Sequence, residues 1–174
     1  MVIRKAREQD IPAVAAIYEA IHDAEEAGKT TIGWMRGTYP TETTARHALK
    51  LGTLYVLEED GRIMAAAKID QEQVEEYADC SSWQYPAQDH QVLVLHTLVV
   101  DPAAGGRGYG SAMVAFYEQQ ARERGCPFLR LDTNCRNANA RALYRKLGYR
   151  EVGVVPCVFN GISGVQLVCI EKKV

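Results

Sequence analysis

The stretch LVVDPAAGGRGYGSAM, residues 98–113, constrains the fold of this chain more than any other part of the sequence. It passes from an apolar, strand-like run through Pro102 into a glycine-rich loop, and then into residues that suit a helix. The loop glycines are Gly105, Gly106, Gly108 and Gly110. Glycine loses more conformational freedom on folding than other residues, so this cluster indicates that something approaches the backbone closely. Backbone N–H groups at the start of a helix suit a phosphate group.

Two nucleotide-binding motifs fit this loop poorly. In a Walker A loop, G-x-x-x-x-G-K-[ST], Gly105 and Gly110 have the required spacing, but Ser111 stands where the lysine must be. In a dinucleotide-binding fingerprint, G-x-G-x-x-G, Ser111 replaces the third glycine after Gly106 and Gly108. The loop also follows several expected strands and does not open a βαβ unit. An enzyme that uses ATP or NAD is therefore the weaker alternative.

The elements expected around the loop alternate between strands and helices. Strands are expected over 2–8, 53–59, 62–69, 91–100, 127–133, 149–159 and 165–173. Helices are expected over 11–28, 41–52, 111–124 and 137–148. Residues 70–90 show no clear period and are interpreted as a connection or a short helix. The order β-α-α-β-β-β-α-β-α-β-β predicts one α+β or mixed α/β domain over residues 1–174.

Composition and charge narrow the class of protein. Of the 174 residues, 47% are hydrophobic and 24% are charged, which is typical of a globular domain. The formal net charge of -2 argues against nonspecific binding to nucleic acid. No apolar run is long enough to cross a membrane, and the first residues, MVIRKAREQD, contain no apolar signal segment, so a cytoplasmic protein is expected. The five scattered cysteines form no CxxC pair, which predicts free thiols and no metal site.

The loop resembles the acetyl-CoA loop of the GNAT superfamily of N-acetyltransferases, whose pattern is [RQ]-x-x-G-x-[GA]. Gly108 and Gly110 match this pattern, Gly105 departs from it, and Arg107 occupies a neighbouring position. A second stretch, NANARALYRKLGY at 137–149, is similar to the family's helix N-x-x-A-x-x-L-Y-x-K-x-G-[FY]. The matching residues are Asn137, Ala140, Leu143, Tyr144, Lys146, Gly148 and Tyr149. The resemblance implies a mixed, mostly antiparallel central sheet flanked by helices.

The resemblance also implies acetyl-CoA as a co-substrate and a set of residues that bind it. The N–H groups of residues 106–111 would surround the pyrophosphate, and Arg107 would add a charge-assisted contact. The amides of the pantetheine arm would pair with the strand at Leu98 and Val100, with Asn137 on the other side. The expected cofactor-binding residues are Leu98, Val99, Val100, Gly105, Gly106, Arg107, Gly108, Tyr109, Gly110, Ser111, Asn137 and Tyr144.

Transfer of an acetyl group from a thioester to an amine requires an acid and a base. A phenol, with a pKa of about 10, is neutral at pH 7 and can protonate a departing thiolate, so Tyr144 is the expected acid. Alternation along the strand places His96 on one face with Val94, Leu98 and Val100, where it either acts as the base or packs beneath the cofactor. Cys135 offers a less favoured covalent route, and direct attack in a ternary complex is preferred.

The acceptor is expected to be an amine of a small molecule or a peptide. Trp34, Tyr39 and Trp83 lie in the two segments without clear periodicity and are expected to line its pocket. The acidic residues of 70–79 would suit a cationic amine. The chain is expected to be a monomer or a homodimer. The alternative function is a catalytically silent module that binds acetyl-CoA as a sensor or an interaction domain.

Overall fold

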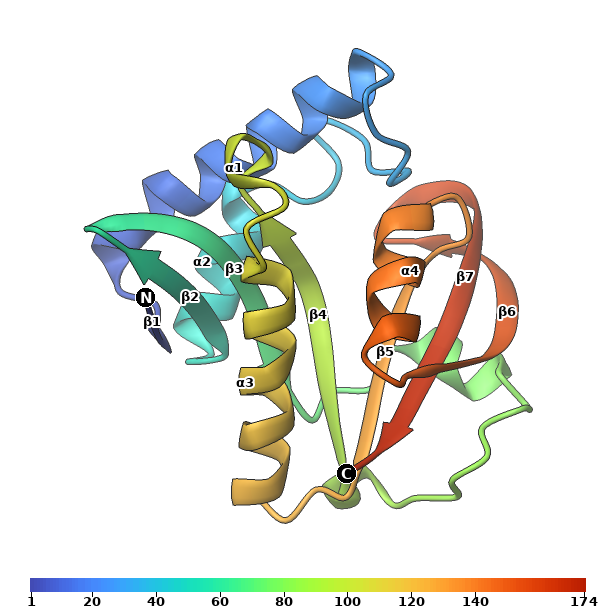
Figure 1. Cartoon of the computed structure of the whole chain (residues 1–174). Coiled ribbons are helices and arrows are strands. Elements are labelled where there is room, and N and C mark those ends of the chain that lie inside the picture. The colour runs from blue at the N-terminus through green and yellow to red at the C-terminus, as the bar shows by residue number, and fades with distance from the viewer.

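The computed structural model describes residues 1–174 and contains one seven-stranded sheet between layers of helices (Figure 1). The strands are β1 (Val2–Lys5), β2 (Leu54–Glu59), β3 (Arg62–Asp70), β4 (Val92–Val100), β5 (Phe128–Asn134), β6 (Arg150–Phe159) and β7 (Ile162–Lys173). The α-helices are α1 (Ile11–Glu26), α2 (Glu42–Lys50), α3 (Tyr109–Glu123) and α4 (Ala138–Lys146). Short 3₁₀ helices are η1 (Glu8–Asp10), η2 (Glu75–Asp79), η3 (Asp89–Gln91) and η4 (Pro102–Ala104). The mixed fold predicted from the sequence is confirmed.

The strand order is β1-β2-β3-β4-β5-β7-β6, and every neighbouring pair is antiparallel except β4–β5. The parallel pairing of β4 with β5 begins at Val92 with Phe128 and ends at Leu95 with Leu131. Both strands continue beyond these residues, β4 to Val100 and β5 to Asn134. The two halves of the sheet therefore separate after Leu95, and a gap opens between β4 and β5.

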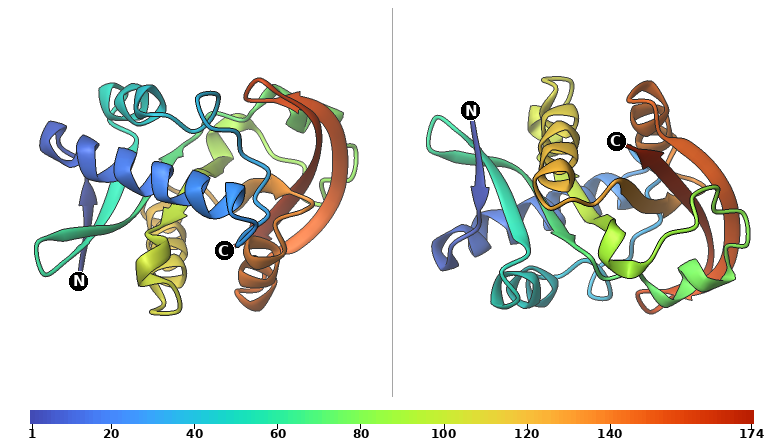
Figure 2. Two further views of the ribbon diagram at one scale, coloured as in Figure 1. Left: turned by 90° about the horizontal axis from the view of Figure 1, so that it is seen from above. Right: turned by 90° about the horizontal axis from the view of Figure 1, so that it is seen from below.

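The two faces of the sheet are covered by different elements (Figure 2). Helices α3 and α4 lie on one face, where Leu93 and Leu95 of β4 join the largest core cluster. Helices α1 and α2 pack on the opposite face of β2 and β3. The segment 71–91, with η2 and η3, covers the rest of that second face, over Val92 and Val94. The sheet is therefore covered on both sides, which explains why β4 is apolar on both faces.

A β-bulge in β4 reverses its face alternation. Ala66 pairs with Val99, but Lys68 pairs with His96, so β4 has one residue more than β3 in this interval. Thr97 sits in the bulge with φ +50°, an uncommon conformation for a non-glycine residue. The bulge places Leu98 on the α3 face, packed against the same cluster as Leu93 and Leu95.

The bulge corrects the prediction that His96 shares a face with Leu98 and Val100. Both of those residues pack toward α3, whereas His96 stays on the opposite face with Val94. The prediction assumed an uninterrupted ladder, in which side chains alternate strictly. One inserted residue moves every later side chain to the other face.

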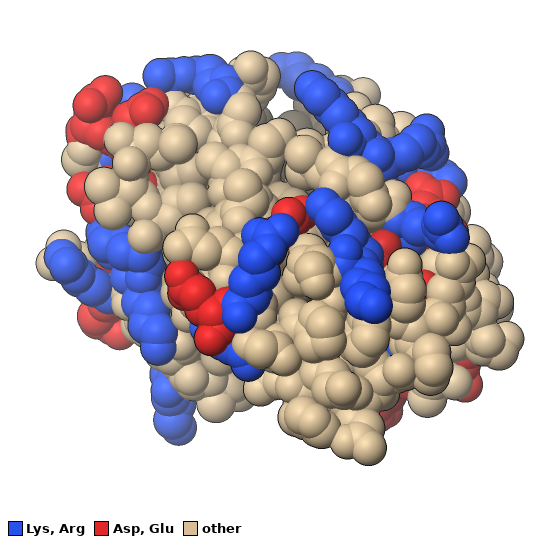
Figure 3. All heavy atoms as spheres, turned by 60° about the horizontal axis from the view of Figure 1, so that its bottom comes forward, with Lys and Arg blue, Asp and Glu red and all other residues tan.

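Surface charge is mixed, and no helix is both long and apolar enough to cross a membrane. On the face shown in Figure 3, Lys and Arg side chains are spread out with Asp and Glu between some of them. No group of three or more His, Cys, Asp or Glu side chains is arranged to hold a metal ion.

Tyr117 of α3 links the two parallel strands just before they separate. Its hydroxyl is buried and lies 2.6 Å from the carbonyl oxygen of Leu93 in β4 and 3.0 Å from that of Arg130 in β5. The hydroxyl shares its one proton between these two acceptors, so one side chain holds both strands where their pairing is about to end.

The Tyr117→Phe variant is expected to lower the free energy of unfolding by about 1–2 kcal/mol, because it removes a buried donor to main-chain carbonyls. Urea unfolding followed by circular dichroism measures the change. Tyr149→Phe is the matched control, because the Tyr149 hydroxyl is buried without a hydrogen-bond partner, so its loss should cost little. Equal destabilisation by the two variants would contradict the assigned role of Tyr117.

Candidate active site

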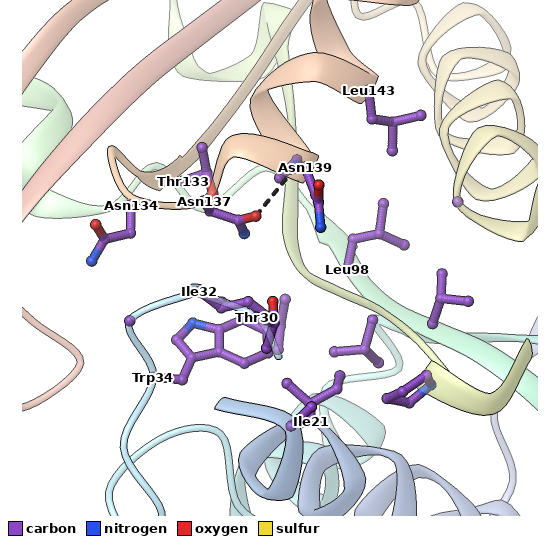
Figure 4. Close-up of a pocket in the computed structure, with 18 of the residues that line it drawn as sticks. Ile21, Thr30, Ile32, Trp34, Leu98, Thr133, Asn134, Asn137, Asn139 and Leu143 are labelled. Carbon is purple, nitrogen blue, oxygen red and sulfur yellow. Dashed lines mark hydrogen bonds between the residues drawn. The ribbon is translucent and has the colours of Figure 1, made fainter. Parts of the chain in front are cut away.

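A cavity of about 800 Å³ opens where β4 and β5 separate. Figure 4 shows Thr30, Ile32 and Trp34, from the segment between α1 and α2, across the space from Asn137 and Asn139 at the start of α4. The ends of β4 and β5, the glycine loop, and parts of β6 and β7 complete the lining. The cavity thus gathers residues from both halves of the sheet.

The glycine loop presents the N-terminus of α3 to the cavity. Gly106 and Gly108 have φ of +78° and +84°, which is the left-handed region that glycine adopts without strain. The first helical hydrogen bond of α3 runs from Ala112 N–H to Gly108 O at 3.0 Å. The backbone N–H groups of Gly110 and Ser111 therefore have no partner within the helix. A Cβ on Gly110 would lie 3.3 Å from Leu143 Cδ2, so a larger residue would crowd the approach of α3 to α4. Free N–H groups at a helix N-terminus form an anion-binding site.

The Arg107 side chain lies outside the cavity lining. Its Nη2 donates to Glu59 Oε2 at 3.0 Å, and its guanidinium lies 5.2 Å from the centre of the Tyr109 ring. Tyr109 also donates to Glu59 through its hydroxyl. In this structure the donors that the loop offers to an anion are therefore its backbone N–H groups.

The edge of β4 faces the gap. Leu98, Val99 and Val100 line the cavity, and their edge toward β5 has no strand partner because pairing ends at Leu95. An extended ligand that carries amide groups can pair with such an edge. Asn137 lies across from this edge, and its Oδ1 accepts from Ala140 N at 3.1 Å to cap α4. The amide nitrogen of Asn137 remains available as a donor.

Tyr144 and Asp132 reach the gap from opposite faces of the sheet. Tyr144, on α4, is 6% exposed and belongs to the cluster under α3 and α4. Asp132, on β5, pairs with Cys169, whose side chain belongs to the cluster under segment 71–91. Both residues line the cavity. The gap therefore connects the two faces at the point where these two polar side chains lie.

The environment shifts the pKa of both side chains upward. Burial raises the pKa of Asp132 to about 6, although the hydroxyl of Tyr77, which donates to Oδ2 at 2.7 Å, and the charge of His96 oppose the shift. Burial and the charge of Asp132 raise the pKa of Tyr144 above its ordinary value. At neutral pH, Asp132 is therefore a carboxylate with an affinity for protons near that of histidine, while Tyr144 stays protonated.

The sequence reasoning missed Asp132. The only local signal was a single carboxylate at the end of the stretch PFLRLD, residues 127–132, which is apolar apart from Arg130 and Asp132. Acidic residues often follow buried strands, so this signal does not distinguish a catalytic residue from a solvated one. The cavity and the contact with Tyr77 show that Asp132 is not a solvated surface carboxylate.

Of the residues expected at the acceptor site or as the base, two line the cavity and two lie outside it. Trp34 and Tyr39 line the cavity with ring centres 5.9 Å apart, and the hydroxyl of Tyr39 bonds to Thr97. Trp83 is outside the lining, where its Nε1 donates to Tyr77 O at 2.9 Å. His96 is also outside the lining, with Nε2 3.1 Å from Asp70 Oδ1.

The acidic residues of 70–79, expected near the acceptor, and Cys135, the less favoured nucleophile, would both have to reach the cavity. None of the acidic side chains of residues 70–79 lines it, and Asp70 instead forms an ion pair with Lys68 at 3.2 Å. Cys135 is half-buried and is also absent from the lining. The acidic segment and the cysteine thiol are therefore not in position to contact a ligand in this cavity.

The fold and the site define a class of protein. A mixed sheet that separates between two parallel strands, with a helix N-terminus beside the gap and the side chains of Asp132 and Tyr144 within it, is the arrangement of an acyltransferase domain. A family model described as the Acetyltransferase (GNAT) family matches residues 14–149, and the chain belongs to this family. The family resemblance drawn from the two sequence motifs is confirmed.

Individual relatives agree with this assignment. An uncharacterized N-acetyltransferase of Methanocaldococcus jannaschii is 32% identical over 77 residues, which cover 44% of this chain and 34% of that protein. The match thus spans about a third of that relative's length. Among solved structures, a GNAT acetyltransferase from Streptococcus agalactiae has a TM-score of 0.77 at 24% identity, covering 99% of this chain and 95% of that one.

Two more solved structures share the fold. A ribosomal-protein-alanine N-acetyltransferase from Brucella melitensis has a TM-score of 0.72 at 23% identity and covers all of both chains. A protein from Salmonella typhimurium, solved with its cofactor acetyl-CoA, has a TM-score of 0.66 at 21% identity, covering 99% of this chain and 92% of that one. At these identities the likeness is one of fold.

The raised pKa of Asp132 predicts a specific dependence of stability on pH. A carboxyl group whose pKa is higher in the folded state than in the unfolded state opposes folding once it ionises. Between about pH 4 and pH 7, the isosteric variant Asp132→Asn should therefore gain about 2–3 kcal/mol of unfolding free energy relative to the wild type. Urea unfolding at a series of pH values measures this gain.

Asp70→Asn is the matched control, because it alters a carboxylate on the same face whose pKa is lowered. Burial alone would raise the pKa of Asp70, but its hydrogen bond to His96 and the neighbouring charges outweigh that effect. Ionisation of Asp70 therefore stabilises the fold, and Asp70→Asn should lose stability relative to the wild type as the pH rises. The same direction of change in both variants would contradict the assigned electrostatics of Asp132.

Proposed function

We propose that this protein transfers an acetyl group from acetyl-CoA to a primary amine of a small molecule or peptide by direct attack in a ternary complex. One observation carries the proposal: Asp132 and Tyr144 line the same cavity from opposite faces of the sheet, at the gap between β4 and β5. A carboxylate that accepts a proton near neutral pH and a protonated phenol are the two groups that the reaction requires.

The cavity lining formed by the glycine loop, the edge of β4 and the start of α4 suits acetyl-CoA. We assign the N–H groups of residues 106–111, at the start of α3, to the pyrophosphate, and the cavity lining by this loop supports the assignment. The open edge of β4 from Leu98 to Val100 suits the amides of the pantetheine arm, and Asn137 offers a donor from α4. The aliphatic side chains of Val100 and Leu143 provide apolar contact.

In the proposed reaction Asp132 accepts a proton from the bound ammonium group, so that the neutral amine can attack the thioester carbonyl. The new C–N bond forms as the C–S bond breaks, and the nitrogen loses its second proton to solvent to give the amide. Tyr144 donates its hydroxyl proton to the departing sulfur and takes one back from solvent, and Asp132 releases the ammonium proton to solvent before the next turnover. His96 lies outside the cavity lining and takes no part in these proton transfers.

The lining residues that are not assigned to acetyl-CoA suggest the acceptor class. Its side chains are mostly aromatic and aliphatic: Trp34, Tyr39, Phe159, Ile162, Val165 and Leu167. The amides of Asn134 and Asn160 add neutral polar groups. The charged residues in the entire lining are Lys29 and Asp132. Because Asp132 is assigned to the reacting amine, the remainder of the acceptor is proposed to be uncharged and largely apolar.

Tyr144→Phe is expected to lower kcat by at least about 100-fold, because the departing thiolate loses its proton donor. Asp132→Asn should have an effect of similar size through loss of the base. Acetyl-CoA should bind both variants as it binds the wild type, which calorimetry measures. Cys135→Ala is the control and should retain activity.

Parallel lines in a double-reciprocal plot of initial rates at several acceptor concentrations would contradict direct attack in a ternary complex.

The acceptor proposal predicts a preference within matched pairs of amines. A monoamine with an aromatic or aliphatic tail should have a kcat/KM at least about tenfold higher than a diamine of equal length, because the diamine must desolvate a second charge in an apolar pocket. Release of free thiol measures the rate. A preference for the diamine would contradict the proposed class.

Binding of acetyl-CoA without thiol release across a broad panel of amines would favour the silent acetyl-CoA-binding module instead.

A further inference from the structure

One buried tyrosine outside the cavity lining contacts Asp132 directly. Tyr77, in η2, is 3% exposed, and its hydroxyl donates to Asp132 Oδ2 at 2.7 Å. Tyr77 approaches from the face of the sheet opposite to α4. Its hydroxyl therefore occupies one carboxylate oxygen from behind, while the other oxygen has no partner among the protein's hydrogen bonds to this residue.

Two contacts with Trp83 hold Tyr77 in place. The two rings meet edge to face with centres 5.2 Å apart, and Trp83 Nε1 donates to the main-chain oxygen of Tyr77 at 2.9 Å. One side chain thus holds both the ring and the backbone of Tyr77. Such double contact limits the freedom of the phenol, so the hydroxyl has a defined position relative to β5.

Arg130 connects this pair to the strand that carries Asp132. Its guanidinium lies 4.2 Å from the centre of the Trp83 ring, and its Nη2 donates to Tyr85 O at 3.0 Å. Arg130 lies two residues before Asp132 on β5, and so on the same face. The series of contacts from Arg130 through Trp83 and Tyr77 to Asp132 therefore begins and ends on β5 and passes through segment 71–91.

We propose that Tyr77 is a positioning residue for the reaction: it holds one oxygen of Asp132 so that the other faces the acceptor amine. The inference rests on the proposed function, in which Asp132 is the base. It assigns segment 71–91 a role behind the base, whereas the sequence suggested that this segment contacts the acceptor through Trp83.

The contact has an electrostatic consequence with a definite sign. A donor to a carboxylate stabilises its charged form, so Tyr77 lowers the pKa of Asp132 and opposes the effect of burial. The other titratable groups around Asp132 come from several elements. They are Tyr39, Glu76, His96, Tyr144, Cys157 and Cys169. A substitution of Tyr77 leaves all of these residues in the sequence, so the contribution of the Tyr77 hydroxyl to the pKa of Asp132 can be measured separately.

The test is Tyr77→Phe, which removes the hydroxyl and keeps the ring. The carboxyl carbon of Asp132 is followed by ¹³C NMR through a pH titration, with Asp132→Asn assigning its signal. The pKa of Asp132 is expected to rise by about one unit. The acidic limb of the pH profile of kcat/KM should move upward by the same amount, so that much of the lost activity returns at higher pH.

Tyr55→Phe is the matched control. Tyr55 is also buried, and its hydroxyl accepts a hydrogen bond from Arg124 at 2.8 Å, away from the cavity lining. This variant should leave both the Asp132 pKa and the pH profile unchanged. Trp83→Phe is a second test variant, because it keeps an aromatic ring and removes the donor to Tyr77 O. It should shift the Asp132 pKa in the same direction by a smaller amount.

An unchanged Asp132 pKa in folded Tyr77→Phe would overturn the inference, as would an equal shift in Tyr55→Phe. If Tyr77→Phe does not fold, an unchanged pKa in Trp83→Phe overturns it. The NMR titration needs no turnover, so the two proposals fail separately. Wild-type protein that binds acetyl-CoA and acetylates no amine would overturn the proposed function, whereas the titration decides the contact of Tyr77 with Asp132.

Discussion

The end of hydrogen bonding between β4 and β5 after Leu95 is the constraint on which the remaining architecture depends. Up to that residue the two parallel strands form one sheet, and Tyr117 holds them together through their carbonyl oxygens. Beyond it, each strand has a free edge toward the other. A continuous sheet would have kept its two faces apart. The separation joins them in one cavity and exposes a strand edge beside the N-terminus of α3.

The separation also explains how Asp132 and Tyr144, the proposed base and acid, can lie at one gap although they come from different faces of the sheet. Tyr144 comes from the α4 face, and Asp132 comes from the face under segment 71–91. Burial disfavours the charged form of both, so the pKa of Asp132 rises to about 6 and Tyr144 remains neutral. The same environment therefore suits one group to accept a proton and the other to donate one, as in other pairs of titratable groups whose roles depend on location.

The two segments without periodicity have different relations to the cavity. Segment 28–41 places Trp34 and Tyr39 in the lining, and the carboxylate of Glu25 holds it by accepting from the backbone N–H groups of Ile32 and Gly33. Segment 71–91 instead packs against the sheet behind Asp132, and its Tyr77 contacts the Asp132 carboxylate. In the sequence both segments looked alike, because each has scattered aromatic residues in a polar context. Only their packing partners distinguish a lining residue from a supporting one.

The sequence by itself determined the order of the elements, the glycine loop before α3 and the helix that carries Tyr144, because turn residues, caps and apolar periods are local signals. Only the tertiary structure decided which side chains meet. The bulge at Thr97 turns Leu98 away from the face of His96, a change that strict alternation does not reveal. The contact of Tyr77 with Asp132 joins residues that lie 55 positions apart. Such contacts follow from how the strands and segment 71–91 pack together, and no local pattern of residue types encodes that packing.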